Sequence, residues 1–226
     1  MTSTLHIGII MDGNGRWAER RRLSRSSGHR AGVTTVRKIV ECAPKLGVGS
    51  LTIYAFSSDN WRRPPTEVRA LMRLLQAYLI HETARCVEQE VRIRFIGRRD
   101  RLPRVLAEAM TSAEDRTRHC RTLTLRIAVD YSSRDAIVAA ARAMAESERF
   151  DRDAMREALG TDDLDLVIRT AGEQRLSDFL LWECAYSEFV FTEKLWPDFQ
   201  PADLESAIET FRNRTRKFGG LLAKAG

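Results

Sequence analysis

One run of residues near the start of the chain combines the groups that a diphosphate and a divalent metal ion need. The run is Met11-Asp12-Gly13-Asn14-Gly15-Arg16-Trp17, and it follows an apolar stretch that begins at Ile7. Its glycines let the backbone approach a ligand closely, and the planar guanidinium of Arg16 matches phosphate oxygens. Asp12 can share a magnesium ion with those oxygens. A tight turn with a capping aspartate is the alternative, and the run alone leaves both interpretations open.

Two further polar segments follow apolar runs. The first, residues 56–64, reads Phe-Ser-Ser-Asp-Asn-Trp-Arg-Arg-Pro and carries hydroxyl, amide, indole and guanidinium groups. The second spaces Arg169, Arg175 and Ser177 so that a compact turn can direct all three at another phosphate. Ordinary turn chemistry is the alternative for the first segment. For the second, the alternative is a charged loop with an internal ion pair between Glu173 and an arginine.

A basic stretch lies between the first two segments. It runs from Arg20 to Arg30 and includes Arg25 and His29. Such a stretch is typical of a solvated face or a nonspecific anion patch. His29 follows Gly28 at a predicted helix start, where free backbone N–H groups favour an anion.

Apolar periodicity predicts the elements that position these segments. Helical stretches separate most of the predicted strands, and this alternation predicts a mostly parallel sheet covered on both faces. Each polar segment follows a strand, so we expect the three to converge on one cleft at the carboxyl ends of the strands. The predicted strands are Leu5–Met11, Ser50–Phe56, Val91–Ile96, Leu123–Val129, Asp165–Thr170 and Glu188–Thr192.

The sequence predicts the position of three helices. The longest spans Pro65–Gln89 and opens with prolines, which suit a helix start. A short helix falls within the charged residues 146–163, and a final helix runs from Pro201 to Lys217 before Gly219-Gly220.

Composition narrows the class of protein. The chain has 226 residues, of which 43% are hydrophobic, so we expect one α/β domain over residues 1–226. The net charge of +6 favours polyanionic partners in general. Without a long apolar run or a leader pattern, we expect a cytoplasmic protein. The cysteines form no paired motif, so we expect reduced thiols; they are Cys42, Cys86, Cys120 and Cys184.

Together and in this order, the segments resemble the cis-prenyltransferase family, which includes the bacterial undecaprenyl diphosphate synthases. The resemblance runs from His6 to Gly220. The matching motifs, as they stand in this sequence, are HIGIIMDGNGRWA from His6, GHRAG from Gly28, YAFSSDNW from Tyr54, RP at Arg63, DLVIRT from Asp165, EQRLS from Glu173, FLLW from Phe179, AY at Ala185 with Glu188, and LWPDF from Leu195.

The resemblance implies a magnesium-dependent enzyme that condenses isopentenyl diphosphate with an allylic diphosphate, farnesyl or geranyl diphosphate, and forms new double bonds in the cis configuration. It implies a Z-polyprenyl diphosphate that serves as a lipid carrier precursor for cell-wall synthesis. Short- or medium-chain products remain an alternative, as does a non-catalytic partner subunit of the same fold. A homodimer that contacts the inner membrane face during product release is also implied.

Residue roles carry over by motif position. Asp12 would hold Mg²⁺ with Glu188, and Asn60 stands in the position proposed for proton removal, although a neutral amide is a poor base. An apolar tunnel would have its walls or floor at Ala55, Leu71, Leu75, Leu123 and Leu125. The residues implied to bind the two substrates are Gly13, Asn14, Gly15, Arg16, Trp17, Arg25, His29, Ser57, Ser58, Asp59, Trp61, Arg63, Arg169, Arg175, Leu176 and Ser177.

The chain departs from the usual family pattern in three places. Asp130-Tyr131-Ser132-Ser133-Arg134 stands where many members have Asn-Tyr-Gly-Gly-Arg, and Ala171 replaces a glycine or serine. Asp178 replaces a frequent asparagine and brings a negative charge near the expected isopentenyl site. A trans-type synthase is not expected, because Asp162-Asp163-Leu164-Asp165 has the wrong spacing and precedes a predicted strand. No nucleic-acid partner is expected, since no binding motif accompanies the arginines.

Overall fold

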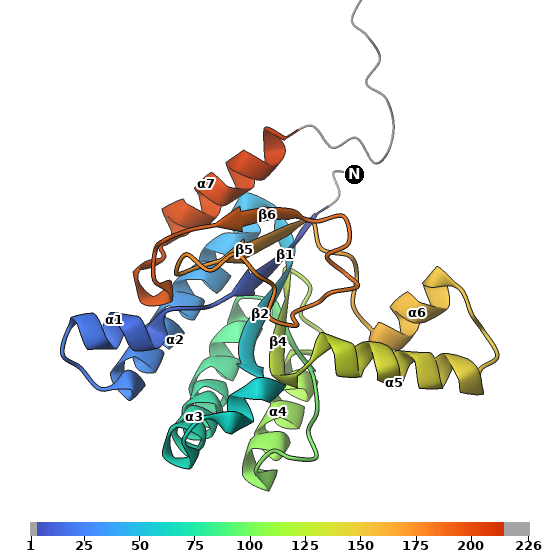
Figure 1. Cartoon of the computed structure of the whole chain (residues 1–226), viewed down its shortest axis with the longest axis horizontal. Helices are drawn as coiled ribbons and strands as arrows, with labels where there is room; N and C mark the ends of the chain where they lie inside the picture. Colours follow the sequence, from blue (N-terminus) through green and yellow to red (C-terminus); the bar gives the residue numbers. More distant parts are fainter. Residues whose placement is uncertain (1–3, 215–226) are drawn as a thin grey trace, which may run out of the picture.

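Six parallel strands form the centre of the molecule (Figure 1). The computed structural model describes residues 4–214. The strand order is β3-β4-β2-β1-β5-β6, and each neighbouring pair is parallel. All six predicted strands are confirmed. Their bounds are β1 Leu5–Ile10, β2 Val48–Ser57, β3 Val91–Ile96, β4 Leu123–Tyr131, β5 Leu166–Arg169 and β6 Glu188–Phe191.

Helices connect most of these strands. The long predicted helix is α3, the short helix in the charged stretch is α6, and α7 is the final helix within the described residues. Helix α7 ends at Arg212, so the predicted end at Lys217 is wrong, and Gly219-Gly220 lie outside the described residues. The helices are α1 Asn14–Arg20, α2 Arg25–Cys42, α3 Pro65–Glu88, α4 Arg104–Thr117, α5 Ser133–Glu146, α6 Arg152–Leu159 and α7 Pro201–Arg212, with 3-10 turns η1 Ala43–Leu46, η2 Ser58–Arg62 and η3 Trp196–Asp198.

The main core lies between one face of the sheet and four helices. Alternate strand residues such as Ile7, Leu51 and Leu125 point to this face and are fully buried. They pack against apolar side chains from α2, α3, α4 and α7, for example Ile39 and Leu106. Burying this apolar surface is what holds the helices on the sheet.

The second face differs from the expectation that helices cover both sides. A smaller core covers part of it and is built from a non-helical segment between β5 and β6 that includes Phe179 and Leu180. Phe179 stacks on Tyr54 of β2 with ring centroids 4.7 Å apart. Helices α5 and α6 pack mainly against each other and extend sideways from the sheet (Figure 1). The connection cannot be helical because Ser177, Asp178 and Leu180 adopt positive φ angles.

The cysteines are free thiols, as predicted, and His6 belongs to the buried structure. Three of the cysteines are buried. His6 is buried on the second face, where its Nε2 lies 2.8 Å from Thr52 Oγ1. Burial lowers the pKa of His6 to about 4.

No helix in residues 4–214 combines the length and the apolar character needed to cross a bilayer.

Candidate active site

The polar residues gather at the carboxyl end of β1, where the strand order reverses. Strand β2 lies on one side of β1 and β5 on the other, so the loops after β1 and β5 leave the sheet side by side. A polar pocket of about 450 Å³ opens at these carboxyl ends. The predicted site residues that line it are Asp12, Gly13, Asn14, Gly15, Arg16, Arg25, His29, Ser57, Asp59, Asn60, Arg63, Arg169, Arg175 and Ser177.

Asp12 lies just after β1 and is held there by Thr170, the residue that follows β5. Its backbone N–H donates to Thr170 Oγ1 at 2.8 Å, and that hydroxyl donates to the Asp12 carbonyl, also at 2.8 Å. One carboxylate oxygen accepts from the Gly13 N–H at 2.9 Å. Gly13 has a φ of 101°, and a Cβ there would lie 2.9 Å from Leu195. This position therefore requires glycine.

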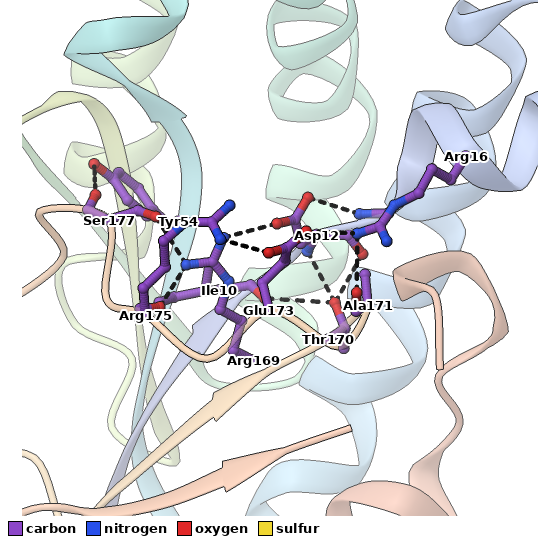
Figure 2. A network of polar contacts seen from close by, with 11 residues as sticks. Ile10, Asp12, Arg16, Tyr54, Arg169, Thr170, Ala171, Glu173, Arg175 and Ser177 are labelled. Carbon is purple, nitrogen blue, oxygen red and sulfur yellow. Dashed lines mark hydrogen bonds and ion pairs between the residues drawn. The ribbon is translucent and has the colours of Figure 1, made fainter. Parts of the chain in front are cut away.

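Arg169 is the centre of the network in Figure 2. Its side chain is 3% exposed, and Nη2 donates to Asp12 Oδ2 at 2.8 Å. Nη1 donates to Ser177 Oγ at 2.8 Å and to the Arg175 carbonyl. Because β5 ends at Arg169 and pairs with β1, the sheet places this guanidinium beside the Asp12 carboxylate.

Two more arginines in Figure 2 share one carboxylate. Arg175 pairs with Glu173, which confirms the internal ion pair considered for this loop, and Arg16 lies 3.6 Å from the same glutamate. Arg16 also donates to the Ala171 carbonyl at 2.9 Å. We call Arg169, Arg175 and Ser177 the strand group.

A second set of cations lies on the helical wall of the pocket. Glu67 of α3 accepts from Arg63 at 3.1 Å, and Arg25 and His29 lie 3.6 and 3.8 Å from it. Burial, followed by the charge of Arg63, lowers the pKa of His29. We call Arg25, His29, Arg63 and Glu67 the helix group. Helix α2 begins at Arg25, so His29 lies in its second turn, and the predicted helix start at Gly28 is wrong.

A close helix contact joins this wall to the Asp12 segment. A Cβ on Gly28 of α2 would lie 2.0 Å from the Asn14 carbonyl oxygen of α1. Only glycine lets the two helices approach this closely. The contact brings Arg16 and Arg25, which both line the pocket, onto adjacent elements.

The turn after β2 closes on itself through its own side chains. Ser57 Oγ accepts from the Asp59 N–H, and Asn60 Oδ1 accepts from the Ser57 N–H, both at 3.1 Å. These bonds form the capping box of η2. The side-chain amide oxygen of Asn60 therefore accepts a hydrogen bond from the backbone within this turn.

Five predicted site residues do not line the polar pocket. The Trp17 indole donates to Asp198 at 2.7 Å, and the Trp61 indole donates to Asp130 at 2.8 Å. Leu176 packs on the smaller core, and Ser58 begins η2. Glu188 pairs with Leu166 in the sheet, at the far end of β5 from Arg169, and forms an ion pair with Arg214 at 2.6 Å.

Some lining residues were not predicted. Tyr54 lines the pocket, and its hydroxyl donates to the carbonyls of Tyr131 and Ser177 at 3.1 and 3.3 Å. The sequence signal was its position near the end of the apolar run, just before the polar residues that begin at Ser57. Glu67, which does not line this pocket but pairs with its basic residues, was not predicted either, although its spacing of four residues from Arg63 is typical of a helical ion pair.

An apolar pocket of about 100 Å³ adjoins the polar one. The two share lining residues, among them Met11, His29 and Leu71. Ala55, Leu71 and Leu75 line the apolar pocket as expected. Leu123 and Leu125 do not line it, because their side chains are buried in the main core.

The donor set at Asp12 suits a metal ion shared with a ligand. Among residues 4–214, no cluster of three or more histidine, cysteine or acidic side chains forms a preformed metal cage. The Asp12 side chain is 38% exposed. Magnesium ions usually take one or two carboxylates together with substrate phosphates, and Asp12 fits that pattern.

The departures from the family pattern are satisfied locally. Asp178 accepts from Ser132 Oγ at 2.6 Å and from the Arg134 N–H at 3.0 Å. The two changes therefore compensate each other, and Asp178 is not among the lining residues of the polar pocket. Ala171 adopts a φ of 72°, a region that favours glycine.

Comparison with known proteins agrees with this geometry. Residues 10–219 match the family model described as "Putative undecaprenyl diphosphate synthase". The chain belongs to this prenyltransferase family. It is 58% identical to Isoprenyl transferase 1 of Bradyrhizobium diazoefficiens, covering 97% of this chain and 91% of that protein. It is 47% identical to the isoprenyl transferase of Brucella abortus, covering 100% and 93%.

Solved prenyltransferase structures have the same fold. Lavandulyl diphosphate synthase from Lavandula x intermedia, in complex with dimethylallyl diphosphate, matches with a TM-score of 0.91 at 37% identity, over 96% of this chain and 98% of that one. A probable undecaprenyl diphosphate synthase from Campylobacter jejuni matches with a TM-score of 0.85 at 32% identity, over 97% and 100%. The prenyltransferase fold thus extends over the whole described structure.

Proposed function

We propose that this protein condenses isopentenyl diphosphate with an allylic diphosphate, geranyl or farnesyl diphosphate, to form a Z-prenyl diphosphate. One observation carries the proposal. Two separate groups of cations line the same polar pocket, and that pocket adjoins an apolar one. Two diphosphates repel each other, so a site that binds both needs a cationic group for each.

Each substrate has a proposed position. The helix group, together with Gly13 to Arg16, binds the allylic diphosphate, whose hydrocarbon tail enters the apolar pocket. Arg169, Arg175 and Ser177 of the strand group bind isopentenyl diphosphate. Asp12 lies between the two groups and would hold Mg²⁺, which offsets negative charge on the diphosphates when it is bound.

The chain's own residues then act on the reacting atoms. Arg25 and Arg63 stabilise the diphosphate that leaves when the allylic C1–O bond breaks. The double-bond electrons of isopentenyl diphosphate form the new bond to C1. A proton then leaves C2, and the new cis double bond forms. Asn60 orients the reacting groups, and a diphosphate oxygen or water accepts the proton.

Product length has two candidates. A long Z-polyprenyl diphosphate, the lipid carrier precursor for cell-wall synthesis, is the first. A short- or medium-chain product is the second, and the small apolar pocket favours it: about 100 Å³, against roughly 300–1,000 Å³ for ordinary ligand pockets. Tyr78 is 8% exposed and lines this pocket. We expect Y78A to lengthen the product, as measured by chromatography of the hydrolysed alcohols.

We also propose a homodimer. Part of the second sheet face lacks a covering helix and carries partly exposed polar residues such as Arg92 and Arg126. The α5–α6 pair extends beside it; Val138 of α5 is 52% exposed, and Tyr186, in the segment between β5 and β6, is 66% exposed. A second copy would cover these surfaces. The cytoplasmic location and the contact with the inner membrane face stay predictions.

Incorporation of radiolabelled isopentenyl diphosphate tests the function. The assay contains Mg²⁺ and one primer at a time: dimethylallyl, geranyl or farnesyl diphosphate. We expect incorporation with at least one primer and loss of it when a chelator removes the metal ion. No incorporation with any primer would contradict the enzyme and favour the partner-subunit alternative.

A further inference from the structure

A buried carboxylate links three loops at the carboxyl ends of neighbouring strands. Asp130 is the penultimate residue of β4, and its side chain is 0% exposed. Its Oδ1 accepts from the Trp61 indole N–H at 2.8 Å. Arg101 donates to both carboxylate oxygens, from Nε at 2.9 Å and from Nη2 at 2.5 Å. Trp61 follows β2 and Arg101 follows β3, so the carboxylate joins the ends of β2, β3 and β4.

The Arg101 side of this contact is held firmly. Asp130 has a φ of 49°, and its carbonyl accepts from the Arg98 N–H at 3.1 Å. Gly97, after β3, has a φ of 109°, and a Cβ there would lie 2.1 Å from the Val129 carbonyl oxygen. The loop that carries Arg101 is therefore pressed against the end of β4, and only glycine permits the approach.

The Trp61 side leads into the active-site turn. Trp61 lies next to Asn60 in η2, and its ring packs edge-on against Phe56 with centroids 5.3 Å apart. The Arg101 guanidinium lies 5.8 Å from the Trp61 ring centroid. Three contacts thus fix one side chain of a turn that otherwise relies on its own capping bonds. That turn brings Ser57, Asn60 and Arg63 to the polar pocket.

We propose that Asp130 and Arg101 form a latch on Trp61 that holds residues 57–63 in the position that this structure shows beside the polar pocket, which we call the closed position. Asp130 is then a positioning residue that acts through Trp61 and touches no substrate. A bidentate pair between a guanidinium and a buried carboxylate is strong and directional. The aspartate is one of the departures from the family pattern, and it gives this chain a charged latch where an asparagine would give a neutral one.

Two readouts separate a latch from general stabilisation. In the free protein, the amide hydrogens of residues 57–63 exchange faster when the latch is broken, because local opening costs less. In the assay, a less populated closed state raises the KM for the allylic diphosphate, while saturating substrate still restores closure and kcat. A loss of overall stability would lower the amount of active enzyme and leave KM unchanged.

The variants are D130N, R101Q and the control R98Q. D130N keeps an acceptor for the indole but loses the charge pair, and R101Q removes the guanidinium. R98Q removes an arginine from the same loop whose partner is the exposed Asp100. We expect D130N and R101Q to speed exchange of residues 57–63 and to raise the allylic KM about tenfold, with kcat changed less than threefold. R98Q should match the wild type in both.

Hydrogen exchange and the allylic KM each have a result that would overturn the latch. Unchanged exchange at residues 57–63 in D130N and R101Q would overturn the latch, and so would faster exchange with an unchanged KM. If D130N does not fold, R101Q carries the test, because the Arg101 side chain is 39% exposed and glutamine fits there. The role in substrate binding rests on the proposed function, whereas the exchange measurement needs no substrate. A protein without prenyl transfer would therefore refute the function separately from the latch.

Discussion

The strand group and the helix group both present arginines to one pocket, but they are built differently. In the strand group, Arg169 ends β5, is almost fully buried and makes two side-chain bonds of 2.8 Å, and it also donates to the Arg175 carbonyl in the loop that follows. In the helix group, Glu67 is the shared partner of three basic residues at 3.1 to 3.8 Å. The first group is pre-organised, and the second is held by longer contacts to one carboxylate.

This difference suggests a division of labour. A rigid group suits a substrate that is the same in every cycle, as isopentenyl diphosphate is. A group held by longer contacts adjusts more easily to an allylic substrate whose tail grows. In both groups, acidic side chains pair with the arginines in the free protein, so in the proposed reaction a diphosphate would replace a carboxylate partner.

The largest expected effect falls on the residue between the two groups. Asp12→Ala should lower kcat about a thousandfold, because it removes electrostatic stabilisation of the leaving diphosphate. Thermal unfolding should shift to a lower temperature, because the buried Arg169 guanidinium loses its carboxylate partner, so kcat is measured at a temperature where the variant is folded. Asp162→Ala is the control, because that aspartate is 76% exposed and lies outside the pocket. An active D12A enzyme would remove Asp12 from the mechanism.

Single arginine variants test whether each group binds a different substrate. We expect Arg175→Gln to raise the KM for isopentenyl diphosphate about 30-fold and to leave the allylic KM within threefold, because one charged hydrogen bond is lost. Arg63→Gln should do the reverse. Steady-state kinetics with each substrate varied in turn measures both. Equal effects on the two KM values in both variants would mean that the groups do not discriminate.

A pH profile sharpens the assignment of the helix group. The pKa of His29 is lowered by burial and by Arg63, so the free protein favours the neutral ring near pH 7. A bound diphosphate favours the imidazolium, so binding takes up a proton and tightens as pH falls. The ratio of the allylic KM of H29N to that of the wild type should rise about fivefold from pH 8 to pH 6. A flat ratio would place the diphosphate away from His29.

The lowered pKa of His29 also makes the free energy of unfolding depend on pH. The folded state favours the neutral ring, so its contribution to the free energy of unfolding falls as pH drops below the ordinary value of 6.5. His6 acts in the same direction from 6.5 down to about 4. Binding and stability therefore change in opposite directions with acid, and the KM ratio is measured above pH 6 for that reason.

The smallest effect concerns the backbone. Ala171 of the strand loop has a φ of 72°, so Ala171→Gly should relieve strain and raise the free energy of unfolding by about 0.5–1 kcal/mol. Ala70 lies within α3 beside the helix group, and Ala70→Gly should lower it by about 1 kcal/mol. Urea unfolding measures both. Destabilisation by A171G would show that the strand loop stores no strain at this position.

The strand group was predictable from the sequence, and the helix group only in part. Asp12 and Arg169 directly follow or end apolar runs that form adjacent parallel strands, so topology alone brings them together. Glu67 has no such signal, because its role appears only when α2 packs against α3. The helix start at Gly28 was wrong for a related reason. Ser24 caps α2 by accepting from the Ser27 N–H, and Gly28 serves the contact with α1.

Sequence patterns also missed how the second sheet face is covered. The alternation of strands and helices indicates helices on both sides, yet the residues between β5 and β6 turn through left-handed conformations at Ser177 and Asp178. Those conformations depend on tertiary bonds such as the one from Ser132 to Asp178. Likewise, Asp130 read only as a departure from a motif, because its partners come from two other strand ends.

A crystal structure with both diphosphates would show whether the two groups of basic residues bind separate substrates. The crystals would contain isopentenyl diphosphate, Mg²⁺ and an unreactive thio analogue of the allylic diphosphate. We expect one diphosphate at Arg25, His29 and Arg63 and the other at Arg169, Arg175 and Ser177, within the same pocket. A single diphosphate that spans both groups at saturating concentrations of each ligand would contradict the account.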